Sequence, residues 1–389
     1  MVSKKREFDR GLLLVALALA GIGLVMVYSS STMWAESNRL GSSFLLMRQS
    51  IRVFIGVTLM LAFMHIDYHV LGRRAGLFLA VALLLLGAVL VVRYTIRGAS
   101  RSLPLPFLGG SVSSFQPAEL ARLALIIYLA DVLAKRQRVI RTFWYGLVPH
   151  AVVIAIAAAL IMLQPDVGTA LATTLAAGIL LFVANVRVSH LAVTSATCLP
   201  FVGWYVLSAP YRRLRLIGFL HPNQYTDSIN YQINQAFIAF SKGGLLGLGL
   251  GQSRQKLLFL PEPFTDFIFP IIGEEFGVLG ALVILALFLM FVWKAIQIAR
   301  WAPDLLGFLL GAGIASMIGT HGAINLAVAM GLLPTTGLAL PFVSYGGSGL
   351  MVTLVSTGIL LSISRQASAA GFWAGRLARS GHTGRGLVS

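Results

Sequence analysis

The chain has 389 residues, of which 57% are hydrophobic and 11% charged, and its mean hydropathy is +0.85. Soluble domains carry about 25% charged residues, so this composition excludes an ordinary water-soluble protein and indicates a chain surrounded mainly by lipid. The net charge of +17 is distributed between apolar stretches rather than on one basic face. We therefore expect anionic lipid headgroups or a phosphorylated lipid as partners, and no nucleic acid.

Apolar stretches long enough to cross a bilayer recur along most of the chain. A helix that crosses a hydrocarbon core of ~30 Å needs about 20 apolar residues. The first stretch follows Lys4-Lys5-Arg6 but extends to about Tyr28 without a small-x-small cleavage site, so we interpret it as a retained helix. The fifth and sixth are short and meet in a tight turn at 164–166. The ten predicted spans lie near 11–29, 49–66, 75–93, 115–134, 147–163, 169–186, 188–208, 267–293, 307–331 and 345–364.

This pattern predicts an all-α polytopic membrane protein with both termini in the cytoplasm. Seventeen Lys and Arg residues then fall on the inner side and twelve on the outer side, in the sense of the positive-inside rule. Most outer cations lie in two segments, 93–101 and 212–256, which indicates either an anionic ligand or contacts with headgroups. We expect residues 1–366 to form one membrane domain and 367–389 a disordered, basic cytoplasmic tail.

The longest polar stretch, 209–266, is predicted to be a large extracytoplasmic loop between the seventh and eighth helices. Within it Ile229, Ile233, Phe237 and Phe240 recur at helical spacing. We therefore expect an amphipathic helix that lies flat at the membrane surface. Several glycines follow it and indicate a flexible connection.

Two carboxylates near span ends are the main candidates for chemistry, because a charge at mid-bilayer costs roughly 2.5–3.5 kcal/mol on insertion scales. Glu119 begins the fourth span and is three positions from Arg122, so the two share a helix face and can pair. This pair either tunes packing or lines a functional cavity. Asp266 directly precedes the eighth span, at the outer surface. It either caps that helix or acts on a substrate there.

Other polar residues have competing structural explanations. Asp166 is a natural cap for the sixth span, and Glu274 and Glu275 are expected to make buried hydrogen bonds or an ion pair. The guanidinium groups of Arg97 and Arg101 can bind phosphate oxygens or extend to the membrane surface.

Several motifs together resemble the SEDS family (shape, elongation, division and sporulation), and the glycine-rich and 332–347 motifs are most similar to its cell-division branch. The resemblance covers nearly the whole chain. Its motifs are 115–120 (FQPAEL), 164–168 (QPDVG), 231–235 (YQINQ), 249–256 (GLGQSRQK), 260–263 (LPEP), 265–267 (TDF), 331–337 (GLLPTTG) and 340–348 (LPFVSYGGS).

The resemblance implies a ten-helix enzyme that polymerises lipid II into glycan strands at the outer membrane face. Asp266 would be the essential catalytic aspartate of the large loop, and Glu119 the acidic residue of the fourth-helix motif. Arg122 stands where the family usually has Lys, which puts a proton-shuttling role in doubt. Phe264 stands where His is usual, which argues against a histidine base at that position. Segment 98–103 departs from the family's paired Arg and Trp, so substrate contacts there are in doubt.

We hypothesise that Asp266 acts as general base toward the 4-hydroxyl of an acceptor sugar, which attacks the donor as undecaprenyl pyrophosphate leaves. The departing pyrophosphate needs positive charge, from arginines or from a divalent cation such as Mg²⁺ or Mn²⁺. We predict Asp266 and Glu119 as catalytic residues. The candidate substrate-binding residues are Arg97, Arg101, Arg122, Asp166 and Lys256.

Two other functions stay open: a lipid II flippase, which also needs charges inside the membrane, and a catalytically silent scaffold for division proteins. A flippase needs critical charges along a path, whereas a polymerase needs one carboxylate at the exit surface. The resemblance further implies a class B penicillin-binding protein (a transpeptidase) and other division proteins as partners. It also implies a place in the cytoplasmic (inner) membrane at the division septum.

Overall fold

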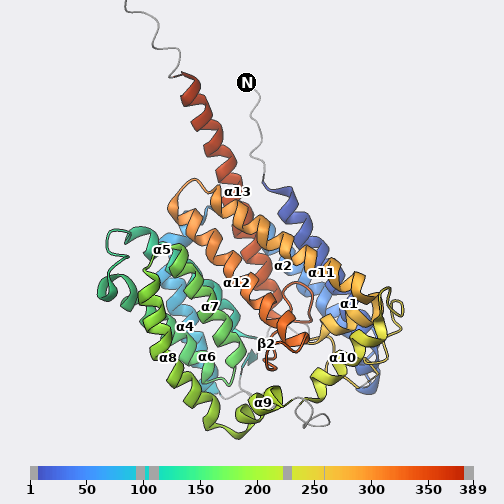
Figure 1. The fold of residues 1–389 in the computed structure, drawn as a ribbon. Helices are drawn as coiled ribbons and strands as arrows, with labels where there is room; N and C mark the ends of the chain where they lie inside the picture. The colour runs from blue at the N-terminus through green and yellow to red at the C-terminus, as the bar shows by residue number, and fades with distance from the viewer. Residues whose placement is uncertain (1–7, 93–100, 105–113, 222–229, 258, 381–389) are drawn as a thin grey trace, which may run out of the picture.

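The computed structural model describes residues 8–92, 101–104, 114–221, 230–257 and 259–380, and these residues are almost entirely helical (Figure 1). One antiparallel pair of two-residue strands, β1 (Leu103–Pro104) and β2 (Ser114–Phe115), is the exception among them. The helices are α1 (Arg10–Ser37), α2 (Phe44–His65), α3 (Tyr68–Arg73), α4 (Ala75–Val92), α5 (Pro117–Lys135), the π-helical turn η2 (Phe143–Leu147), α6 (Val148–Met162), α7 (Val167–Val183), α8 (Val188–Ser208), α9 (Pro210–Leu220), α10 (Tyr231–Gly243), α11 (Ile268–Arg300), α12 (Leu305–Ala329) and α13 (Ser348–Ser380).

Each of the ten predicted spans coincides with a helix of the structure: α1, α2, α4, α5, η2 with α6, α7, α8, α11, α12 and α13. Among the described residues, seven helices are both long and apolar enough to cross a membrane. The apolar parts of α4 and α7 are shorter, and α5 carries two carboxylates and two cations. The multi-pass helical fold is therefore confirmed, while the number of spans stays a prediction.

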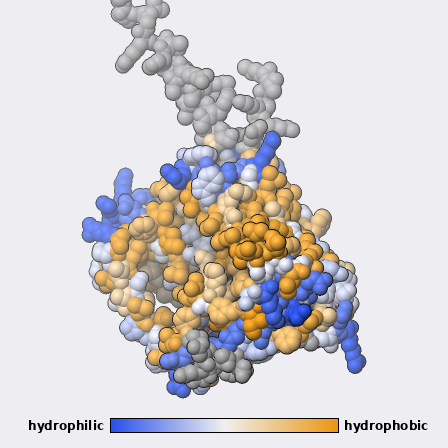
Figure 2. Space-filling model, turned by 45° about the vertical axis from the view of Figure 1, so that its right-hand side comes forward, coloured by the Kyte–Doolittle hydropathy of each residue, from blue (hydrophilic) through white to orange (hydrophobic). Residues whose placement is uncertain are grey.

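The core lies around α12, which packs against α5, α7 and α11. Its buried face carries small residues as well as large ones, and Gly311, Gly313 and Gly322 bring neighbouring side chains close to its backbone. By contrast, α8 has no buried residue and exposes Leu199, Phe201 and Trp204. Apolar residues also cover the middle of the face in Figure 2, with hydrophilic residues gathered toward the ends of the bundle. Such an apolar surface suits lipid.

The two ends of the bundle are different. The start of α1 and the end of α13 lie at one end, the terminal end, whereas α9, α10 and the strand pair lie at the other, the loop end (Figure 1). The start of α1 and the end of α13 lie on the same side, as an even number of crossings between them requires. Helix α13 continues to Ser380, beyond residue 367 where we expected a disordered tail to begin.

The predicted amphipathic helix is present as α10, but the side chains that it buries differ from the expected stripe. Ile233, Ala236 and Ala239 are buried where α10 packs against α11, while Phe237 is 45% exposed. The spacing of large apolar residues was misleading because small alanines make the close contact with α11. Ile229 lies outside the described residues.

The first turns of α11 are interrupted at Gly277, whose φ of 67° is in the left-handed region. The chain that follows α10 passes directly against this break. Leu248 and Gly249 donate backbone hydrogen bonds to the carbonyls of Glu274 and Glu275, at 3.0 and 2.9 Å. A Cβ atom at position 277 would lie 2.4 Å from the carbonyl oxygen of Leu245, so glycine is required both for the backbone angle and for the close approach.

Candidate active site

Asp266 lies at the loop end, immediately before α11, and its side chain is half-buried. The N-cap of α11 is Phe267, so Asp266 stands one position before the capping position. The Thr265 hydroxyl lies 2.9 Å from Oδ1 of Asp266. A carboxylate at this position can accept a proton from a group presented at the loop end.

The segment between α12 and α13, residues 330–347, forms the other side of the site; we refer to it as the 330–347 loop. Gly337 has a φ of 72°, and a Cβ atom there would lie 4.0 Å from Oδ2 of Asp266. Asn325, on the last full turn of α12, donates from Nδ2 to the backbone carbonyl of Asp266 at 2.9 Å and to that of Leu338 at 2.5 Å. One buried amide thus joins the aspartate segment to this loop.

The same loop returns to the aspartate segment through Tyr345. Its backbone N–H donates to the carbonyl of Phe264 at 2.8 Å. The Phe264 ring is fully buried and packs edge-on against the rings of Trp34 and Tyr345. Phe264 therefore anchors the segment by packing.

Glu119 and Arg122 form the predicted ion pair on α5, with Nη1 of Arg122 2.8 Å from Oε2 of Glu119. Both side chains are buried, and Nη2 of Arg122 also lies 3.4 Å from the carbonyl of Met317 on α12. With His321 and the 330–347 loop they line a cavity of about 40 Å³. A cavity of this size is enough for water, which needs roughly 10–15 Å³. Nε of Arg122 is buried without a partner among the described residues.

The 330–347 loop and the start of α13, which follows it, therefore lie beside both predicted catalytic carboxylates. Gly337 lies beside Asp266, and a Cβ atom at Gly349, the second residue of α13, would lie 3.5 Å from Cδ of Glu119. On α12, His321 and Asn325 are four positions apart and share a face. Glu119 thus lies at a small cavity behind the loop, whose volume of about 40 Å³ is too small for a large substrate and suits a positioning role.

Asp166 caps α7, as predicted, because its Oδ1 accepts a hydrogen bond from the backbone N–H of Thr169 at 3.1 Å. Its Oδ2 accepts from Nε2 of Gln116 at 3.2 Å, which ties it to the start of α5. Arg101 donates to the carbonyl of Pro165 at 2.6 Å. These two candidates therefore meet at the turn between α6 and α7. Arg97 lies outside the described residues.

Lys256 does not join these groups. Its Nζ is 3.2 Å from Oε1 of Glu275 and 2.6 Å from the carbonyl of Gly251, and the side chain is 8% exposed. Ser29 of α1 donates to the same carboxylate. Glu274 accepts hydrogen bonds from Ser253 and from two backbone N–H groups of the loop. The expected buried roles of Glu274 and Glu275 are confirmed, and Lys256 is engaged with them.

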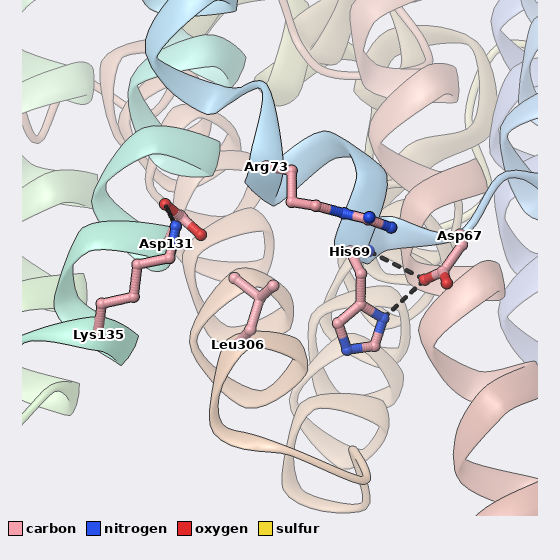
Figure 3. Close-up of a pocket in the computed structure, with 6 residues that line it drawn as sticks. All are labelled: Asp67, His69, Arg73, Asp131, Lys135 and Leu306. Carbon is pink, nitrogen blue, oxygen red and sulfur yellow. Dashed lines mark hydrogen bonds and ion pairs between the residues drawn. The ribbon is translucent and has the colours of Figure 1, made fainter.

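A second cavity lies away from these carboxylates, at the terminal end. It has a volume of about 400 Å³ and is lined by Asp67, His69, Arg73, Asp131, Lys135 and Leu306 (Figure 3). Nδ1 of His69 is 2.7 Å from Asp67, and Nε2 is 2.7 Å from Asp304. This His69 cluster links α3 with the start of α12.

A divalent cation was the one cofactor that we considered. Among the described residues no three His, Cys, Asp or Glu side chains converge on a common point. Mg²⁺, however, is commonly held by one or two carboxylates together with substrate phosphates. The single carboxylate of Asp266 fits that mode, with a pyrophosphate providing the remaining ligands.

Residues 10–369 match the model of a family of cell cycle proteins named for FtsW, RodA and SpoVE. The chain belongs to this family. It is 41% identical over 367 residues to the stage V sporulation protein E of Bacillus subtilis, covering 94% of this chain and 99% of the relative. It is also 41% identical over 360 residues to the probable peptidoglycan glycosyltransferase FtsW of Trichlorobacter lovleyi, covering 92% and 93%. The SEDS resemblance read from the motifs is thus confirmed.

Solved structures of the family agree with the fold. One is a chain from a peptidoglycan synthase complex that coordinates polymerisation and crosslinking; it is 30% identical, with a TM-score of 0.75 over 92% of this chain and 98% of that one. Another is the rod shape determining protein RodA of Thermus thermophilus, which is 29% identical, with a TM-score of 0.67 over 92% and 97%.

The sequence indicated the carboxylates of the site but not the amide that holds one of them. Asn325 lies within an apolar span and is 1% exposed. A polar side chain inside a span is itself a signal of function, yet its two partners lie 59 and 13 positions away. The chain offered no spacing from which that contact could be inferred.

Proposed function

We propose that this protein is a peptidoglycan glycosyltransferase that polymerises lipid II at the outer face of the cytoplasmic membrane. Its membership of a family with relatives named as probable peptidoglycan glycosyltransferases supports the reaction class. The observation that carries the proposal is the position of Asp266, a half-buried carboxylate at the loop end that lies beside Gly337 of the 330–347 loop. The loop end is then the outer face.

In this mechanism Asp266 takes the proton from the 4-hydroxyl of the acceptor sugar as that oxygen attacks the anomeric carbon of the donor. The bond from that carbon to the pyrophosphate breaks, and undecaprenyl pyrophosphate leaves with the bonding electrons. Arg101, at the turn beside Asp166, is the described cation that we assign to the leaving group. A divalent cation bound by Asp266 and the pyrophosphate would supply further positive charge.

The test is polymerisation of lipid II by the purified protein. Wild type should produce glycan strands, and Asp266→Asn should reduce the rate by about 10²–10⁴, the usual contribution of a general base. Glu36→Gln, which removes an exposed carboxylate just before the end of α1, is the matched control and should retain full activity. Polymerisation by Asp266→Asn at the wild-type rate would overturn the assignment.

A transport activity has one observation in its favour, the buried Glu119–Arg122 pair within the bundle. A transport function predicts that the protein moves lipid II across the membrane of vesicles and that Asp266→Asn leaves this movement intact. For a silent scaffold, Asp266→Asn would support normal division.

We further propose that the protein works at the septum with a class B penicillin-binding protein and other division proteins, since a structural relative belongs to a peptidoglycan synthase complex. Co-purification with that transpeptidase tests the pairing.

A further inference from the structure

The Asn325 side chain is placed in an unusual way for a residue inside an apolar helix. It is 1% exposed, and its amide nitrogen donates to two backbone carbonyls that belong to different segments, those of Asp266 and Leu338. Its Oδ1 atom is buried and has no partner among the described residues. Buried polar atoms in proteins are nearly always paired, so an unpaired one calls for an explanation.

The two carbonyls are on either side of the candidate base. Asp266 contributes its own backbone carbonyl, while Leu338 directly follows Gly337, whose Cβ position is 4.0 Å from Oδ2 of Asp266. The amide therefore fixes the separation between the aspartate segment and the 330–347 loop. It does so from a rigid element, because α12 lies at the centre of the bundle.

We propose that Asn325 is a positioning residue, which holds the Asp266 carboxylate at a set distance from the 330–347 loop and so orients it toward the substrate. Asn325 acts through the two backbone carbonyls to which it donates. The kinetic part of this inference rests on the proposed polymerase activity, whereas its structural part does not.

Two substitutions separate positioning from folding. Asn325→Leu removes both donated hydrogen bonds. Asn325→Asp has the same shape, but its ionised form cannot donate, and only its protonated form offers one O–H. The control is Asn185→Asp, the same chemical change at an exposed position just beyond α7, at the terminal end.

The first measurement is hydrogen exchange of the purified full chain, which requires no substrate. Asn325→Leu should increase exchange at residues 264–268 and 336–340 while leaving α5 and α7 unchanged, and Asn185→Asp should leave these segments at the wild-type rate. Unchanged exchange at both segments in Asn325→Leu would overturn the proposal, whatever the activity of the protein.

The second measurement is lipid II polymerisation at several pH values. We expect kcat to fall by about 10- to 100-fold in both variants with KM nearly unchanged, since misplacement by ~1 Å can cost 10²-fold. The deficit of Asn325→Asp should shrink as the pH falls, because protonation restores a donor, while that of Asn325→Leu should stay constant. If the wild-type protein is active and both variants are equally active, the positioning role is overturned. Inactive wild type would instead count against the polymerase function, and the exchange result would still decide the role of Asn325.

Discussion

Two aspartates near helix starts show how one residue type serves different purposes in this fold. Asp166 occupies the N-cap of α7, and its Oδ1 accepts a hydrogen bond from the backbone N–H of Thr169. Asp266 lies one position before the N-cap of α11. That single position matters, because a side chain at the N-cap can reach the free N–H groups of the first turn. The carboxylate of Asp266 lies beside the 330–347 loop, where a Cβ atom at Gly337 would be 4.0 Å from its Oδ2.

Arg122 is the residue at which this chain departs from the motif that it resembles, and its contacts suggest what Arg adds. The guanidinium reaches both Glu119 and the carbonyl of Met317, so it joins α5 to α12. A Lys ammonium has a single donor centre and cannot replace this forked contact in full. The residue is therefore better suited to holding two helices together than to moving a proton.

We predict that Arg122→Lys keeps polymerase activity within about tenfold and loses about 1 kcal/mol of stability, the contribution of one hydrogen bond. Arg122→Met should lose about 3–5 kcal/mol, because Glu119 would remain as an unpaired buried charge. Thermal unfolding in detergent measures both, and Glu119→Gln combined with Arg122→Met should recover part of the loss. Equal stability of the two single variants would show that the pair does not carry this energy.

At the scale of elements, backbone hydrogen bonds and an ion pair both hold the chain after α10 against the break in α11. The carbonyls of Glu274 and Glu275 accept hydrogen bonds from this chain, while their carboxylates bind its side chains and N–H groups. Ser29 brings α1 into the same contact. The segment that leads to Asp266 is thus held at two points, here and at Asn325.

Lys256→Met should destabilise the protein by about 3–5 kcal/mol, since it leaves Glu275 charged and buried without its partner. Removing both charges in Lys256→Met/Glu275→Leu should restore much of this stability, because a buried pair is often replaceable by apolar residues. Thermal unfolding of the single and double variants provides the measurement. A double variant no more stable than Lys256→Met would contradict the ion-pair explanation.

What the sequence could predict depends on how far apart along the chain the interacting residues lie. The ten spans and the Asp166 cap are local features, set by composition or by residues a few positions apart, and the helices fall where they were expected. The ion pair of Lys256 could not be predicted, because its partner Glu275 is 19 residues away across an irregular loop. Asn325 was missed for the same reason. Local spacing carries no information about such contacts.

At the scale of the whole molecule, polar clusters lie at both ends of the bundle. The loop end holds the candidate base, and the terminal end holds the His69 cluster with its open pocket (Figure 3). In that cluster Asp304 caps α12 while accepting hydrogen bonds from the Tyr68 hydroxyl at 2.8 Å and from the His69 ring. Gln366 of α13 donates to Asp67 at 3.1 Å. Helices α2, α3, α12 and α13 are therefore joined at this end.

The titration of His69 predicts how the stability of this end depends on pH. Partial burial alone would lower the pKa of His69, but hydrogen bonds to Asp67 and Asp304 and their negative charges raise it above 6.5. Partial burial alone would likewise raise the pKa of Asp67, yet hydrogen bonds from His69 and Gln366 lower it below 3.8, so Asp67 stays charged at neutral pH. Arg73 and Lys135 line the same pocket. A neutral imidazole has one donor for two carboxylates, so the protonated ring binds both more strongly.

Because folding raises the pKa of His69, its stabilising contribution is complete below about pH 6.5 and is lost as the pH rises through the higher pKa of the folded state. We therefore expect the Tm of the wild-type protein to fall as the pH rises above about 6.5, and the fall to be smaller in His69→Gln, which lacks the titrating group. His221→Gln, at an exposed position of the loop end, should follow the wild-type curve. Parallel curves for wild type and His69→Gln would mean that the two carboxylates hold this end together without help from the proton on the ring.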